Sequence, residues 1–240
     1  MKKGTPNEAG DHPHHQSFWF DHGDVNGISF WDLGENAGQI KTKRVNKISS
    51  DGSKATIAFE NEWNAKDGKT VCTDDQIMTF QSMGDATAVD YTITIHASDG
   101  DIVFGDTKEG SMGIRTNPSL RIDKGATAIN SEGVSGKSIW GKRAKWVDYS
   151  ADIDGHKVGV AMMDHPSNLR YPTWWHARDY GLVAANPFGI HDFEKKPAGT
   201  GDFKLKNSDS ITFKYRILFH TGDSKTADIE KQYKKFITAK

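Results

Sequence analysis

ITFKYRILF, residues 211–219, has an apolar side chain at every second position, with polar residues between them from Thr212 to Arg216. In an extended chain successive side chains point to opposite sides, so the apolar residues share one face and the polar residues share the other. This pattern is typical of a β-strand with one face on a hydrophobic core and one face in water. The segment therefore predicts an antiparallel sheet. Its apolar positions are Ile211, Phe213, Tyr215, Ile217 and Phe219.

The same alternation recurs elsewhere. VDYTITI at 89–95 is the second clear case, and shorter or less regular runs predict strands over 18–20, 28–31, 40–48, 55–63, 70–80, 145–153 and 157–163. Asp-Gly pairs tolerate the positive φ of tight hairpin turns, and they stand at 51–52, 67–68, 99–100 and 154–155. The expected fold is all-β: an antiparallel two-sheet β-sandwich, supersandwich or jelly-roll-like, forming a single domain over 1–240, with a jelly-roll barrel as the alternative.

A helix is expected only at the C-terminus. Ile229, Tyr233, Phe236 and Ile237 follow the i, i+4, i+7, i+8 spacing of an amphipathic helix, and Thr226 is a suitable N-cap. Acidic residues precede lysines along this segment, as the helix dipole favours. The sequence therefore predicts one substantial helix over 226–236.

Composition narrows the classes of partner. Lysine and arginine number 31 against 32 acidic residues, so the near-zero net charge favours neither nucleic acid nor an anionic membrane surface as a partner. Cys72 is the single cysteine, which excludes an internal disulfide and favours a buried, inert thiol. The start lacks the apolar centre of a signal peptide and no apolar run reaches membrane length, so we expect a soluble protein, cytoplasmic as written or exported if the N-terminus is trimmed. The oligomeric state stays open.

Histidines crowd the segment DHPHHQSFWFDHGDVNG, residues 11–27: they are His12, His14, His15 and His22. Histidine is the commonest metal ligand and an acid or base near neutral pH, so metal binding, metal-free ligand or catalytic contacts, and structural hydrogen bonding are the three alternatives. If this segment is extended, His12 and His14 share a face and are the candidate metal ligands. The cupin motif fails, because Phe18 stands where it needs a glutamate. We expect no cofactor and no tightly bound metal, with a divalent ion as the open alternative.

A glycine-bounded bend, GDTKEGSMGIRT at 105–116, carries Asp106, Lys108, Glu109 and Arg115. Glycines allow a close approach of ligand to backbone, and a carboxylate beside cations can be held ionised as a base or acceptor. A solvated charged turn is the alternative interpretation.

The densest segment is DHPSNLRYPTWWHARDYGLVAANPFGIHDF, residues 164–193. Aromatic rings beside hydroxyl-binding side chains suit a sugar, whose C–H faces stack on aromatics while its hydroxyls need polar partners. Core packing explains about half of the aromatics, but not the polar residues between them. The residues of interest are His165, Trp174, Trp175, His176, Arg178, Tyr180 and Asn186. Motifs of serine hydrolases, zincins and dinucleotide enzymes are absent from the sequence.

In these three segments the sequence resembles the bacterial PmoA-like family, named for methane oxygenase and largely without assigned function. The resemblance implies an association with carbohydrate-degrading gene sets, and its name suggests an oxygenase, although a chain without membrane spans does not resemble the membrane copper enzyme. Relatives carry further β-sequence before HPHH, so the resemblance implies either an N-terminally shortened member or a natural variant with an exposed sheet edge. The residues that fall on the family's motifs are His15, His22, Glu109, Arg115, His165, Trp175, His176, Arg178, Tyr180 and Asn186.

The function expected is a carbohydrate-active enzyme that cleaves, eliminates or epimerises a sugar. His176 or His165 is the expected general acid or base with Glu109 as partner carboxylate, Trp175 or Trp174 stacks on the ring, and Arg178 and Arg115 hold an anionic group. A non-catalytic carbohydrate-binding module is the second alternative and a metal-dependent oxygenase the third. If a shared site exists, one concave face should carry His15, His22, Glu109, His165, His176 and Arg178.

Overall fold

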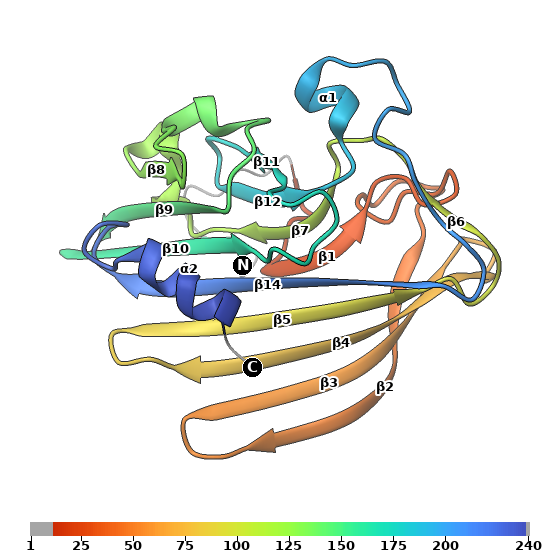
Figure 1. Cartoon of the computed structure of the whole chain (residues 1–240), viewed down its shortest axis with the longest axis horizontal. Helices are drawn as coiled ribbons and strands as arrows, with labels where there is room; N and C mark the ends of the chain where they lie inside the picture. Colours follow the sequence, from red (N-terminus) through yellow and green to blue (C-terminus); the bar gives the residue numbers. More distant parts are fainter. Residues whose placement is uncertain (1–11, 239–240) are drawn as a thin grey trace.

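The computed structural model describes residues 12–238, so the opening residues on which the targeting expectations rest lie outside it. Two antiparallel sheets pack face to face in a sandwich (Figure 1). The larger sheet has the strand order β2 (Gln39–Ser50), β3 (Lys54–Asn64), β4 (Thr70–Ser82), β5 (Ala86–His96), β14 (Ser210–Thr221), β10 (His156–Asp164), β9 (Trp146–Ile153), β8 (Thr127–Asn130). The smaller sheet has the order β1 (Phe18–His22), β7 (Gly110–Arg115), β12 (Leu182–Asn186), β11 (Trp174–Ala177), and β6 (Ile102–Phe104) pairs with β13 (Phe203–Leu205). The predicted all-β sandwich is confirmed.

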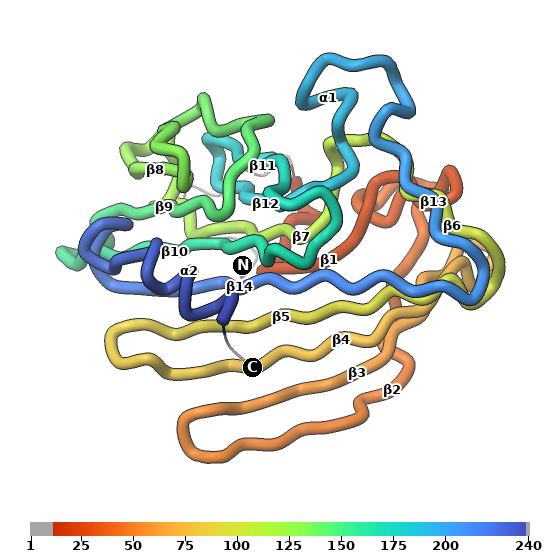
Figure 2. Tube along the Cα trace, in the orientation of Figure 1, coloured from red at the N-terminus to blue at the C-terminus, as the bar shows by residue number. Residues whose placement is uncertain are grey.

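The hydrophobic core lies between the two sheets. Phe213, Tyr215 and Ile217 of β14 are buried there, as the alternation predicted, while Phe219 remains 41% exposed. The tube in Figure 2 shows β2, β3 and β4 continuing past the small sheet, so one end of the large sheet is left without a covering layer. Cys72 is fully buried within the same core, as expected of an inert thiol.

The helix α2 (Ile229–Thr238) packs on the opposite face of the large sheet. Its buried side chains, Ile229, Tyr233 and Phe236, are those that the spacing predicted. The expected start at Thr226 was wrong by three positions, because the backbone and hydroxyl of Thr226 both donate to Asp223 Oδ1 and hold a turn before the helix. No helix within residues 12–238 is long and apolar enough to cross a membrane.

Two further sequence predictions were wrong. Residues 28–31 form bends rather than a strand, although Ile28 makes an isolated bridge to Val25. The second is that helix occurs only at the C-terminus, because a short helix, α1 (Ile190–Glu194), lies between β12 and β13. Single 3₁₀ turns lie at Pro118–Leu120, Ile122–Lys124 and Gly136–Ile139. The Asp99–Gly100 turn joins β5 to β6, two strands that pair with other partners, whereas the remaining three Asp-Gly turns close antiparallel hairpins.

Candidate functional site

The outer face of the small sheet, which points away from the core, is built around one row of residues. Trp19 of β1 pairs with Gly113 of β7, Gly113 with Ala184 of β12, and Ala184 with His176 of β11. A Cβ atom at Gly113 would lie 2.7 Å from the ring of Trp19, so the indole lies directly over the glycine. Two small residues in the centre of the row therefore leave room for rings on this face, and Trp31 packs there beside Trp19.

Histidines from the N-terminal segment cover this face. The segment forms a turn closed by a hydrogen bond from His15 N to His12 O, so the extended geometry that would have aligned His12 with His14 is not adopted. His15 stacks on Trp19 with ring centroids 5.3 Å apart and meets Trp31 edge-on at 5.2 Å. We call the set His12, His14, His15, His176, Trp19, Trp31 and Tyr180 the histidine cluster.

His15 is neutral in this environment. Burial, together with the charges of the neighbouring His14, His12 and Arg115, lowers its pKa to about 2. The guanidinium of Arg115 donates to Nδ1 at 3.4 Å, which places the remaining ring hydrogen on Nε2. Nε2 is buried and has no hydrogen-bond partner among the described residues. The ring is therefore an uncharged wall of the site.

His176 is held in one tautomer by the bend at 105–110. Its Nδ1–H donates to the backbone oxygen of Lys108 at 2.9 Å, so Nε2 carries the lone pair. Burial lowers the pKa of His176 to about 4, against the opposing effect of the charge on Glu109. Glu109 pairs with Lys108 at 3.1 Å and its side chain is 35% exposed. Within the site, a buried neutral base thus stands beside an accessible carboxylate.

Two arginines share the ring of Tyr180. The guanidinium carbon of Arg115 lies 4.9 Å from the ring centroid, and that of Arg178 lies 5.6 Å from it. Such cation–π contacts fix the planar groups without neutralising them. The positive charge predicted near the site is therefore present at its Tyr180 end.

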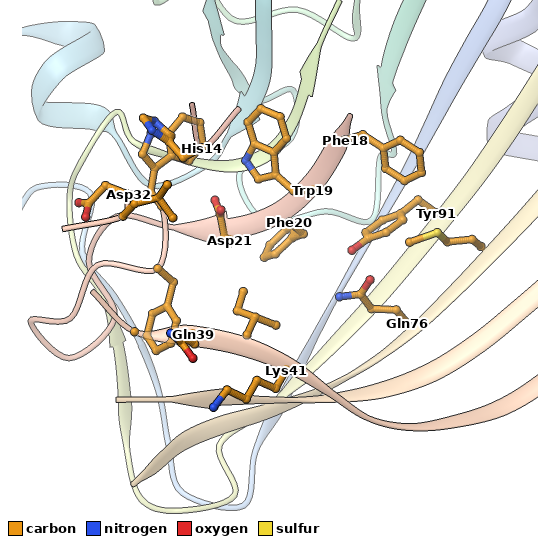
Figure 3. A pocket seen from close by; sticks show the side chains of 16 residues that line it. His14, Phe18, Trp19, Phe20, Asp21, Asp32, Gln39, Lys41, Gln76 and Tyr91 are labelled. Atoms are coloured by element: carbon orange, nitrogen blue, oxygen red, sulfur yellow. The ribbon is translucent and has the colours of Figure 1, made fainter. Parts of the chain in front are cut away.

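An open cleft adjoins the cluster at β1, the edge strand of the small sheet. It has a volume of about 470 Å³ and lies between β1, the 30–41 segment and the inner face of the large sheet. Figure 3 shows Trp19 and Asp21 on one side of β1 and Phe18 and Phe20 on the other. We call it the edge cleft; its lining includes His14, Phe18, Trp19, Phe20, Asp21, Phe30, Trp31, Asp32, Gln39, Lys41, Gln76, Met78 and Tyr91.

Two predicted site residues lie away from the cluster. His165 stands beside α2, with its ring 5.3 Å from that of Phe236, and it is not part of the cluster. His22 faces the core, where Nε2 donates to Gly105 O at 2.8 Å and the ring packs on Phe188. The expectation of one face carrying all six residues was therefore wrong for His165 and His22.

The tryptophan prediction also needs correction. Trp175 points into the core, is fully buried, and donates to Ala144 O at 2.9 Å, so it cannot stack on a ligand. Trp174 is on the outer face, but Arg143 covers its ring at 4.4 Å and its indole N–H donates to Glu194. Alternation along β11 sends neighbouring residues to opposite faces, and that parity was not visible in the sequence.

Asn186 anchors the bend that carries Glu109. Its Nδ2 donates to Thr107 O at 2.9 Å, while its Oδ1 accepts from the backbone of Phe188 at 2.8 Å and of Gly189 at 3.1 Å. All three contacts are to backbone, so Asn186 positions the bend rather than facing a ligand.

Sequence reasoning missed Trp19, Trp31 and Asp21. The signal for two of them was present in FWFDH, because an i, i+2 pair on a strand shares a face. No group of three His, Cys, Asp or Glu side chains within residues 12–238 has the arrangement that holds a metal ion. His12 and His14, the candidate metal ligands, therefore belong to no such group in the described part of the chain.

Comparisons with solved structures return sugar-related proteins at low similarity. A GH36 α-galactosidase from Geobacillus stearothermophilus is 12% identical, with a TM-score of 0.40 over 87% of this chain and 30% of its own. A putative aldose 1-epimerase from Escherichia coli is 8% identical (TM-score 0.39; 91% of this chain, 81% of that chain), and a galactose mutarotase-like protein from Clostridium acetobutylicum is 8% identical (TM-score 0.36; 86% and 79%). This chain spans less than a third of the α-galactosidase. Likeness at this level carries no argument about activity, and no curated protein matches the sequence.

The resemblance to the PmoA-like family was wrong. The family match extends over residues 3–234 and is to a different family, whose description assigns no function, and no PmoA-like match is found. The oxygenase alternative rested on that name and loses its support. With nearly its whole length matched, the chain belongs to the family of unknown function DUF6807.

Proposed function

We propose that this protein is a carbohydrate-active enzyme that moves protons on a sugar bound where the histidine cluster meets the edge cleft. His176 is the base in this proposal and Glu109 is its partner carboxylate. The observation that carries it is the fixed tautomer of His176, whose Nδ1–H is committed to Lys108 O at 2.9 Å. An imidazole oriented in this way offers Nε2 as an acceptor without needing to lose a proton first.

The aromatic surroundings support a sugar as the ligand. Trp19 and Trp31 belong to both the cluster and the cleft. Gly113 and His15 cover the two faces of the Trp19 indole, so the part of it that lines the cleft serves as apolar surface for the C–H groups of a pyranose. Asp21, Gln39 and Gln76 supply acceptors and donors for hydroxyl groups along the cleft. This combination of apolar walls and convergent polar groups is what a polyhydroxylated ring requires.

Access to His176 involves Trp31. His176 is 3% exposed, and the two rings stack with centroids 6.5 Å apart. Trp31 lies in the irregular 28–38 segment rather than in a strand, and irregular segments move more readily than sheets. In the proposed enzyme, a shift of Trp31 opens the base to the ligand.

Arg178 and Arg115 are assigned to an anionic group of the substrate or of an intermediate, such as a uronic carboxylate or an enolate. Guanidinium groups bind such oxygens in bidentate geometry. Their common contact with Tyr180 brings both charges to one end of the cluster. Uronic acids and neutral aldoses therefore both belong in the first substrate screen.

The test is turnover of a panel of aldoses, uronic acids and their methyl glycosides, followed by NMR, which detects anomeric exchange, elimination and cleavage together. We expect His176→Ala and Glu109→Gln each to lower the rate at least about 100-fold, the usual range for a lost acid or base. His165→Ala is the matched control, because that histidine lies beside α2, and it should leave the rate unchanged. Equal rates for all four proteins refute the proposed roles.

A non-catalytic carbohydrate-binding module is the second candidate. The burial that keeps His15 and His176 neutral favours it, because neutral rings can serve packing alone. Sugar binding by calorimetry that survives in His176→Ala and Glu109→Gln, with no turnover in the wild type, would assign the chain to this class.

A further inference from the structure

The edge cleft holds more free space than the histidine cluster. Residues of the cluster are packed tightly: His15 and His176 are each 3% exposed and Trp31 is 6% exposed. The cleft beside them has about 470 Å³, within the range of roughly 300–1,000 Å³ that small-molecule sites occupy. A ligand that reaches the cluster therefore has most of its available volume in the cleft.

The two regions share walls. His14, Trp19 and Trp31 belong to the cluster and also line the cleft. Figure 3 shows His14 and Trp19 at this shared wall. Trp19 is fixed from both sides, by Gly113 beneath it and by the stacked ring of His15. A molecule lying along Trp19 would pass from one region to the other without leaving the protein surface.

The far end of the cleft combines apolar surface with polar side chains, as sugar-binding sites do. Tyr91 and Met78 supply apolar surface from the large sheet, and Gln76 lies beside them. Gln39 and Lys41 line it from β2. Both ends of the cleft can therefore accommodate a ring with hydroxyl groups at its rim.

Asp21 marks the middle of this path. Its Oδ1 is enclosed by the protein and forms no hydrogen bond with any described residue. A buried polar atom without a partner destabilises the fold, so such atoms call for a specific explanation. Burial raises the pKa of Asp21 well above its usual range, and the charge on Glu109 adds to this effect while a hydrogen bond with Trp19 opposes it. A neutral carboxyl group can donate one hydrogen bond and accept others.

We propose that the edge cleft is a second subsite, which binds the next sugar unit of an oligosaccharide whose reacting unit lies at the histidine cluster, with Asp21 as a polar anchor between them. This inference rests on the proposed function and specifies its substrate class: glycans of at least two units rather than free monosaccharides.

The experiment measures the dissociation constants of galactose, glucose, melibiose, lactose, maltose and cellobiose by calorimetry. At least one disaccharide should bind about 10-fold or more tightly than either of its component monosaccharides. Met78→Trp fills the cleft from the strand β4, and we expect it to reduce the ratio of disaccharide to monosaccharide affinity to below about threefold. Ile77→Trp is the matched control: it is the neighbouring residue, 46% exposed and outside the lining of the cleft, and should keep the gain.

Asp21 is tested separately. Asp21→Ala should lose at least about 10-fold of the disaccharide affinity, whereas Asp21→Asn, which keeps a donor and an acceptor in place, should stay within about threefold of the wild type. Thermal melts show whether either Asp21 variant fails to fold. If one does, the disaccharide affinity of Met78→Trp decides whether the second subsite exists.

The two proposals fail in different ways. Turnover that depends on His176, with disaccharides binding no more tightly than monosaccharides, overturns the second subsite and leaves the proposed function standing. If Met78→Trp still binds the disaccharide about 10-fold more tightly than the monosaccharides, the second subsite is likewise overturned. If no sugar of the panel binds, both proposals fall.

Discussion

Replacement of Asp164 by asparagine tests how the sandwich supports the strand that carries His176. Asp164 ends β10 and is fully buried. Its Oδ2 accepts from the backbone N–H of Thr173 at 2.9 Å, directly before β11, and its Oδ1 accepts from Asn168 Nδ2 at 2.8 Å. Burial raises the pKa of this carboxyl group from 3.8 to about 7, although both of these hydrogen bonds act in the opposite direction. The group is therefore a buried acid whose ionisation opposes folding.

The magnitude follows from linkage. In the unfolded chain Asp164 loses its proton near pH 3.8, whereas in the folded chain it keeps the proton up to about pH 7. Between these values the folded state binds more protons, so the free energy of unfolding decreases as the pH rises and levels off above about pH 7. A difference of about three pH units, at roughly 1.36 kcal/mol each, amounts to about 4 kcal/mol.

An asparagine side chain does not titrate, so Asp164→Asn removes this slope. Urea unfolding of both proteins at pH 4, 5.5, 7 and 8 gives the difference between their free energies of unfolding at each pH. All other ionisable groups are common to the two proteins and largely cancel in that difference. Relative to the variant, the wild type should lose about 4 kcal/mol between pH 4 and pH 8. A difference that stays constant within about 1 kcal/mol refutes the assignment of a raised pKa to this buried carboxyl group.

Two further predictions concern the candidate site. Gly113→Ala places a methyl group 2.7 Å from the ring of Trp19, so it should destabilise the fold by about 1–3 kcal/mol and shift the tryptophan emission, and a melt and spectrum identical to the wild type would contradict the packing. If His176 is the base, its neutral form is the reactive one and burial lowers its pKa to about 4, so kcat/KM should fall as the pH drops through about 4 and stay level from there to neutral pH. An acid limb centred near 6.5 would mean that an exposed histidine carries the reaction.

The sequence predicted the large sheet well and the small sheet poorly, for one physical reason. Strands β5 and β14 have one buried and one more exposed face along much of their length, so their side chains alternate and the pattern is local. Every residue of β7, β11 and β12 is buried, because the core covers one face and the histidine cluster contacts the other. A strand covered on both faces loses its alternation and cannot be distinguished from other apolar runs.

The candidate site divides in the same way. The three chemistry-rich segments do meet at His15, Glu109, His176 and Arg178, which composition and spacing could indicate. Which member of each neighbouring pair faces the site depends on strand parity and register, and these are set by pairing between segments far apart in the chain. Trp174 and Trp175 are neighbours in the sequence, but their side chains point to opposite faces of the small sheet. His165 directly follows β10, and its ring lies against Phe236 of α2 rather than in the cluster.

Strand β1 explains why the cluster and the cleft occur together. Its period of two sends Phe20 into the core and places Trp19 and Asp21 on the opposite face, so a five-residue strand serves the sandwich and the site at once. β1 stands at the edge of the small sheet in the described part of the chain, and the edge cleft opens along it. Open strand edges are exposed to pairing with other chains and are usually protected by charges or covering segments. Here Asp32 and Lys41 lie around the edge, and their charges oppose the addition of a strand and leave the space open to a small polar ligand.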